Sequence, residues 1–158
     1  MIIIDTIKNM SDDRFLAIYE GLSDRGYGPL DGEVAKALKF RPQAIRKLAF
    51  DKRAKKARQI ILDSNNAEIA YELCGGYLMH VHESLMPDFL DAMGIPHENG
   101  MIEDMDATTP DPAKLDEVLT KLDGDYPAED VTLYLCICAM QWPEIPELLS
   151  AWEVRTAA

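Results

Sequence analysis

Three histidines in one short stretch of the chain are the side chains best suited to metal or acid–base chemistry. His80, His82 and His97 are all of the protein's histidines, and Glu83 directly follows the second of them. Imidazole nitrogens and carboxylate oxygens are the ligands that catalytic zinc and non-haem iron take from proteins. A metal-dependent enzyme centred on these four residues is therefore one hypothesis for the function.

The spacing of the histidines argues against a shared metal ion. The zincin signature places two histidines four residues apart, and di-iron bundles need the Glu-x-x-His motif twice. On a helix, His80 and His82 would point about 200° away from one another, unless the helix ended between them. We therefore expect the histidines to cap a helix end or to bond carbonyls near the turn 94–100 (GIPHENG), and we predict no cofactor. The sequence leaves open whether that turn is a functional site or a connector.

A run of basic residues is the second candidate site. Residues 36–58 carry ten basic side chains and one acid, a net charge of +9, whereas residues 63–158 carry twenty acids against three basic side chains, a net charge of −17. Lysines and arginines on a helix over residues 51–62 could neutralise the phosphates of a nucleic acid. Because the whole chain has a net charge of −12 and no aromatic residues interleave with these cations, we favour a solvated or self-complementing face. The basic side chains concerned are Lys52, Arg53, Lys55, Lys56 and Arg58.

Two other patterns carry little chemistry. Cys136 and Cys138 lack the spacing of a redox or metal motif, so we expect buried thiols in a reducing cytoplasm. The acidic loop 103–111 opens like a calcium-binding loop but lacks the glycine and the glutamate that such a loop requires, so we expect it to be solvated. The sequence contains no nucleotide-binding glycine loop and no nucleophile motif.

The element expected to organise the fold is the apolar stretch Val131–Trp142, VTLYLCICAMQW. Ten of its twelve residues are apolar or aromatic, and none is charged. Pro127 and two acids precede it and Pro143 follows it, which is typical of the start and the end of a helix. We predict a buried helix, too short to span a bilayer, which needs about 20 residues.

Further helices are predicted from amphipathic periodicity and from capping residues. We predict an all-α fold of about eight helices in a single domain of 158 residues, as a compact bundle or a short superhelix. Two Tyr-Leu pairs 57 residues apart, each followed by a proline and an acid, indicate two stacked helix pairs in the C-terminal part. The predicted elements besides the central helix are 1–10 (a helix or an edge strand), 11–22, 33–40, a short helix from 42, 51–62, 67–81, 87–93, 112–122 and 144–152.

The sequence favours a binding protein over an enzyme, because it predicts pairs of helices but contains no recognisable catalytic motif. The first hypothesis is a non-catalytic cytoplasmic protein that binds another protein or a second copy of itself. The alternatives are a nucleic-acid-binding module that uses the helix over residues 51–62 and the metal-dependent enzyme described above. We expect neither a nucleic-acid partner nor a membrane.

Overall fold

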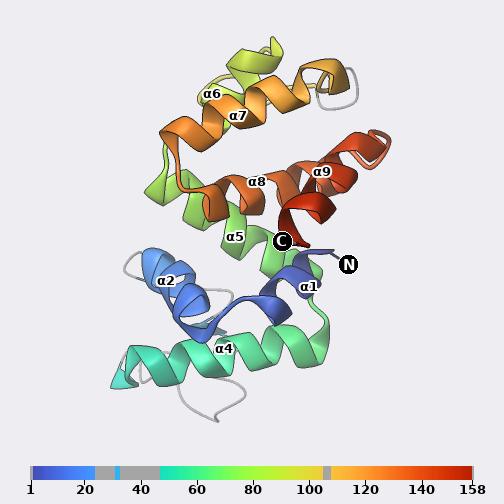
Figure 1. Ribbon diagram of the computed structural model, residues 1–158. Helices are drawn as coiled ribbons and strands as arrows, with labels where there is room; N and C mark the ends of the chain where they lie inside the picture. Colours follow the sequence, from blue (N-terminus) through green and yellow to red (C-terminus); the bar gives the residue numbers. More distant parts are fainter. Residues whose placement is uncertain (1, 24–30, 33–46, 105–107, 158) are drawn as a thin grey trace. The chain divides into compact units, whose positions relative to one another are not determined.

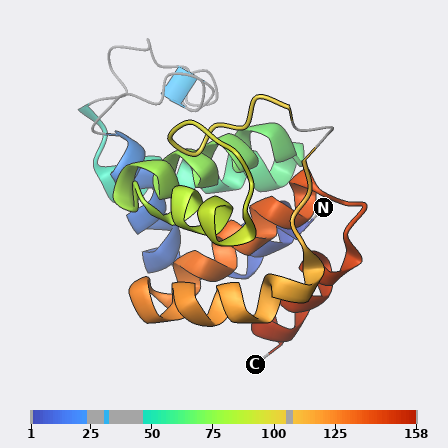
Figure 2. The same cartoon turned by 90° about the horizontal axis from the view of Figure 1, so that it is seen from above.

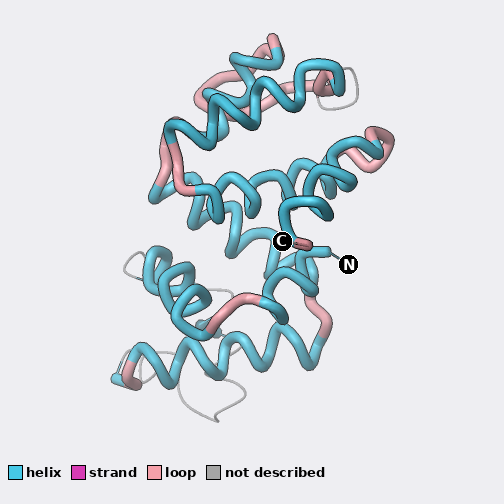
Figure 3. Tube along the Cα trace, viewed as in Figure 1, coloured by secondary structure: helices cyan, strands magenta, loops and turns pink. Residues whose placement is uncertain are grey.

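Helices make up most of the structure, a computed structural model that describes residues 2–23, 31–32, 47–104 and 108–157 (Figure 1). Eight α-helices, one 3₁₀ turn and no β-strand lie within these residues, and short loops join many of the helices (Figure 3). The predicted all-α fold is confirmed, and the opening segment is a helix and not an edge strand. The helices predicted over 33–40 and from 42 lie outside the described residues. None of the helices in the described part is long and apolar enough to cross a membrane.

The chain divides into two compact units, residues 1–80 and 81–158. The single domain expected from the sequence stays a prediction. Unit 1 contains α1 (Ile2–Asn9), α2 (Asp12–Ser23), α4 (Phe50–Ser64) and all but the last residue of α5 (Ala67–Val81). Unit 2 contains α6 (Leu85–Met93), the 3₁₀ turn η2 (Pro112–Lys114), α7 (Leu115–Asp125), α8 (Ala128–Gln141) and α9 (Pro146–Thr156).

In unit 1, α4 packs against both α1 and α2. Ser11 caps α2, because its hydroxyl oxygen accepts the backbone N–H of Arg14 at 3.1 Å. The side-chain oxygen of Asn66 accepts the N–H of Ile69 at 3.1 Å and so caps α5. The predicted start of α4 at residue 51 is one residue late. That helix begins at Phe50, which places Asp51 in its first turn and not at its cap.

In unit 2, α6 packs against α7, and α8 packs against α7 and α9 (Figures 1 and 2). The pairing of α8 with the helix that follows it agrees with the second of the two predicted helix pairs. The prediction that α8 is a buried helix is confirmed, since nine of its fourteen residues are buried. In α9, Leu148 is buried, whereas Leu149 is 38% exposed.

One arginine links three elements of unit 2. The guanidinium of Arg155 donates two hydrogen bonds to the carboxylate of Asp123, at 2.7 and 2.9 Å, and one to the hydroxyl of Thr132 at 2.8 Å. These contacts join α9 to α7 and α8. The Arg155 guanidinium also holds the pKa of the Asp123 carboxyl below its ordinary value.

The turn after α6 is built on two glycines with positive φ. Gly94 ends α6 at φ 72°, and Asn99 and Gly100 follow at φ 53° and 87°. Glu98 and Met101 exchange backbone hydrogen bonds of 2.8 and 2.9 Å across them, which makes a two-residue hairpin turn. A Cβ atom on Gly100 would lie 3.5 Å from the Cβ of Met86 and from the Cδ of Pro87.

Gly100→Ala is expected to lower the free energy of unfolding by about 1 kcal/mol, because alanine is strained at positive φ. Urea denaturation followed by tryptophan fluorescence measures this, since both tryptophans lie in unit 2. Gly124→Ala is the control. Gly124 lies within α7, where an added Cβ meets nothing within 4 Å, so alanine there should be neutral or stabilising. Equal loss of stability in both variants would contradict the prediction.

Candidate binding pocket

The basic side chains of α4 do not all face solvent. Arg53 is only 4% exposed, and its guanidinium carbon lies 4.6 Å from the ring centre of Phe50 and 5.7 Å from that of Tyr19. Guanidinium groups are attracted to the faces of aromatic rings, so this arginine helps to pack α4 on α2. The expectation of a solvated basic face is therefore wrong for Arg53.

Arg58 also turns inward and binds the end of α1. Its guanidinium donates to the backbone carbonyl of Ile7 at 2.8 Å, to that of Lys8 at 3.3 Å and to that of Met10. Carbonyls at the end of a helix have no partner within the helix, and Arg58 supplies one. The same guanidinium donates to the carboxylate of Asp12 at 2.6 Å. Arg58 therefore does not lie on a solvated face either, because its guanidinium is engaged by other residues of unit 1.

Three lysines remain on the outer surface of α4. Lys52 and Lys55 are exposed, and the partly exposed Lys56 donates to the side-chain oxygen of Gln59 at 3.3 Å. The number of basic side chains on this helix that could reach a phosphate is therefore three and not five. The nucleic-acid hypothesis is weakened accordingly, because affinity for nucleic acid grows with the number of phosphates neutralised. The basic residues between 36 and 46 lie outside the described part of the chain.

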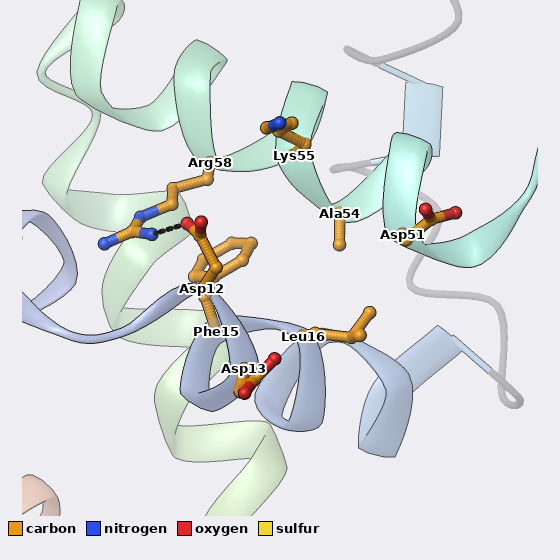
Figure 4. Close-up of a pocket in the computed structure, with 8 residues that line it drawn as sticks. All are labelled: Asp12, Asp13, Phe15, Leu16, Asp51, Ala54, Lys55 and Arg58. Carbon is orange, nitrogen blue, oxygen red and sulfur yellow. Dashed lines mark hydrogen bonds and ion pairs between the residues drawn. The ribbon is translucent and has the colours of Figure 1, made fainter.

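A cavity of about 180 Å³ opens between α2 and α4 (Figure 4). Its floor is apolar, and Phe15 and Ala54 are only 2% and 3% exposed there. Figure 4 shows Arg58 and Asp12 at one end of the cavity and Asp51 at the other. Because small-molecule sites usually measure about 300–1,000 Å³, this cavity is too small for a typical cofactor. The lining residues are Asp12, Asp13, Phe15, Leu16, Asp51, Ala54, Lys55 and Arg58.

Charged side chains form the rim of this pocket. Asp12 pairs with Arg58, whereas Asp13, Asp51 and Lys55 form no ion pair with any other residue in the described part of the chain. Asp13 and Asp51 lie in the first turns of α2 and α4, where the helix dipole stabilises negative charge. The sequence patterns did not predict this pocket, because it depends on which faces of α2 and α4 meet.

Two of the histidines bind aspartates in different elements of unit 2. The Nε2 atom of His82 lies 2.6 Å from the carboxylate of Asp130, which is 3% exposed in the first turn of α8. The Nε2 atom of His97 lies 2.7 Å from the carboxylate of Asp91, and its Nδ1 atom accepts the backbone N–H of Gly100 at 3.0 Å. His97 was expected to bond a backbone carbonyl near the turn 94–100. It bonds a backbone N–H group of that turn instead.

The predicted metal ligands are not gathered into a site in the described part of the chain. Within those residues, no three histidine, cysteine, aspartate or glutamate side chains are close enough to hold an ion. α5 ends at Val81, between His80 and His82, and the Nδ1 atom of His80 is buried without a hydrogen-bond partner among these residues. Glu83 is exposed. The three cysteines are free and buried as expected, and burial raises the pKa of Cys138 to about 12.

Comparison with known proteins assigns no family to the chain. No protein-family model matches it, and neither the curated proteins nor the solved structures contain a match.

Tyr126 and Asp88 form a contact beside His82 that no sequence pattern predicted. The Tyr126 hydroxyl donates to the Asp88 carboxylate at 2.6 Å, and the ring of Tyr126 meets that of His82 edge-on, with centres 5.5 Å apart. Burial raises the pKa of Tyr126 to about 12, and the hydrogen bond to Asp88 contributes to the shift. Asp88 lies on α6, Tyr126 directly follows α7, and His82 precedes α6. Only the tertiary structure brings Tyr126 to the other two.

The raised pKa of Tyr126 predicts a late phase in an alkaline titration of the phenols. The neutral phenol is favoured in the folded state, so its stabilisation is present below the ordinary pKa of 10.0 and is lost as the pH rises through about 12. Between these two values, wild type and Tyr126→Phe should show equal phenolate absorbance, because Tyr126 is still protonated. Asp88→Asn should move its ionisation to lower pH. A Tyr126→Phe variant that loses one early-titrating phenolate would contradict the assignment.

Proposed function

We propose that this chain is a non-catalytic cytoplasmic protein that binds a protein partner, which is either another protein or a second copy of the chain. The pocket between α2 and α4 is the observation that carries the proposal. Its floor is apolar, its rim is charged, and its volume suits one side chain of a partner. A few anchor side chains in such pockets supply most of the binding free energy of a protein interface.

The cysteines and the charge of the chain support the other parts of the proposal. Three free cysteines are buried, which fits a reducing compartment such as the cytoplasm. A nucleic-acid partner is less well supported, because Arg53 and Arg58 are engaged inside unit 1 and the net charge of −12 repels phosphate.

The test compares the wild-type chain with a variant whose pocket is filled. Leu16→Arg places a long side chain in the pocket and changes the net charge by +1. Glu20→Gln, on an exposed position of α2 outside the pocket, makes the same change in charge and serves as the control. Each form is immobilised for affinity capture from a cell extract, with the retained proteins measured by mass spectrometry. Sedimentation velocity of each free form measures self-association.

We expect wild type and Glu20→Gln to retain the same partner, or to self-associate equally. Leu16→Arg should weaken that binding by about tenfold, because its own side chain occupies the place of the anchor. A partner that all three forms bind equally would contradict the proposal. So would a chain that retains no protein and stays monomeric.

A further inference from the structure

The charges that line the α2–α4 pocket indicate which side chain it accepts. Arg58 already neutralises Asp12 at 2.6 Å, which leaves Asp13, Asp51 and Lys55 with a net charge of −1. A cation entering the pocket would bring this charge to zero, whereas an anion would double it. We infer that the pocket accepts a lysine or arginine side chain of the partner, an inference that depends on the proposed function.

The apolar floor suits the stem of such a side chain. Phe15 and Ala54 are almost fully covered by their neighbours, and Leu16 lies beside them (Figure 4). Lysine and arginine lay their methylene groups on apolar surface while the charged head reaches polar groups or water. An acidic side chain of the partner would fit less well. Aspartate and glutamate have shorter stems, and Lys55 is the single lining cation without an ion pair among the described residues.

Two carboxylates at the pocket form no ion pair with the residues that the structure describes, and they come from different helices, Asp13 from α2 and Asp51 from α4 (Figure 4). The helix dipole explains an acid in the first turn of each helix, but it does not explain an apolar hollow that both acids border. Together, carboxylates and hollow are complementary to a cation on a long apolar stem. Arginine fits especially well, because its planar guanidinium presents five N–H donors in a fixed fork.

The test uses two small probes of equal shape. N-acetyl-arginine methylamide carries the guanidinium, and N-acetyl-citrulline methylamide replaces it by a neutral urea group. Each is titrated into the full chain, and the chemical shifts of the backbone amides are followed by NMR. The variants are Asp13→Asn and Asp51→Asn, with Asp63→Asn, exposed on α4 outside the pocket, as the control. The spectrum of each variant before titration shows whether it is folded.

We expect saturable shifts at the pocket residues with the arginine probe, and binding of the citrulline probe about tenfold weaker. Asp13→Asn and Asp51→Asn should each weaken arginine binding by about threefold, as expected for exposed ion pairs, and Asp63→Asn should not. Equal affinity for the two probes, or shifts confined to residues outside the pocket, would overturn the inference.

Failure of this inference is distinguishable from failure of the proposed function. If Leu16→Arg loses the partner while the arginine probe does not bind, the anchor is a different side chain and the inference alone is wrong. If the probe binds as expected but no partner is captured and the chain is monomeric, the preference for a cation is supported and the proposed function is wrong.

Discussion

His82→Ala is expected to lower the free energy of unfolding by about 3 kcal/mol. The carboxylate of Asp130 is almost fully buried, and His82 lies 2.6 Å from it. Alanine at position 82 removes the hydrogen bond between the imidazole and this buried carboxylate, and loss of a hydrogen-bond partner is costly for a buried charged group. Urea denaturation followed by tryptophan fluorescence measures the change, because Trp142 and Trp152 both belong to unit 2.

A double-mutant cycle separates the hydrogen bond between His82 and Asp130 from the loss of packing around His82. Asp130→Asn removes the buried charge but keeps the shape of the side chain, so His82→Ala should cost at least ~1 kcal/mol less in that background. The exposed neighbour Glu83 provides the control, since Glu83→Ala should change stability by less than ~0.5 kcal/mol. Strictly additive effects of the two substitutions would show that the pair contributes nothing beyond packing.

Arg58→Ala is expected to cost about 2–4 kcal/mol, because it removes several charge-assisted hydrogen bonds at once. The carbonyls at the end of α1 would lose their donor, and Asp12 its partner. Hydrogen exchange of the amides in α1, together with the loss of helical circular dichroism on heating, measures the effect. Relative to wild type, the amide exchange rate should rise more in α1 than in α8, since the contacts of Arg58 lie in unit 1.

Three further substitutions test the geometry that this prediction assumes. Arg58→Lys keeps the charge but has no planar fork, so it should recover less than half of the lost stability. Lys55→Ala, one turn earlier on the exposed side of α4, should change stability by less than ~0.5 kcal/mol. Full rescue by lysine would show that charge alone matters. Asp12 is 85% exposed, so Asp12→Ala should account for only a minor part of the loss.

The fold class was predictable because periodicity and capping are local properties of a helix. In α7 the spacing of Leu115, Val118, Leu119 and Leu122 predicts one apolar face, and all four are buried. Gly94 was predicted to end α6 and does so at positive φ. Boundaries were less accurate. α6 begins two residues before the predicted Pro87, and α4 begins at Phe50, because neighbouring contacts as well as caps decide where a helix starts.

Little of the candidate site was predictable. The five basic side chains of α4 share one helix, and the sequence gives no sign that Arg53 finds two aromatic rings and Arg58 finds the end of α1. Long basic side chains can reach inward or outward from the same backbone position. What lies opposite them decides between the two, and that partner surface comes from α1 and α2.

The sequence by itself determined that the chain is helical, where most of the described helices lie, and that the cysteines are buried, because each of these follows from neighbours within a few turns. Tertiary structure alone decided that His82 meets Asp130, that the Tyr126 hydroxyl meets Asp88, and that α2 and α4 enclose a pocket. The physical reason is that these contacts join residues far apart in the chain. Periodicity fixes the direction of a side chain on its own helix but not the surface that it meets.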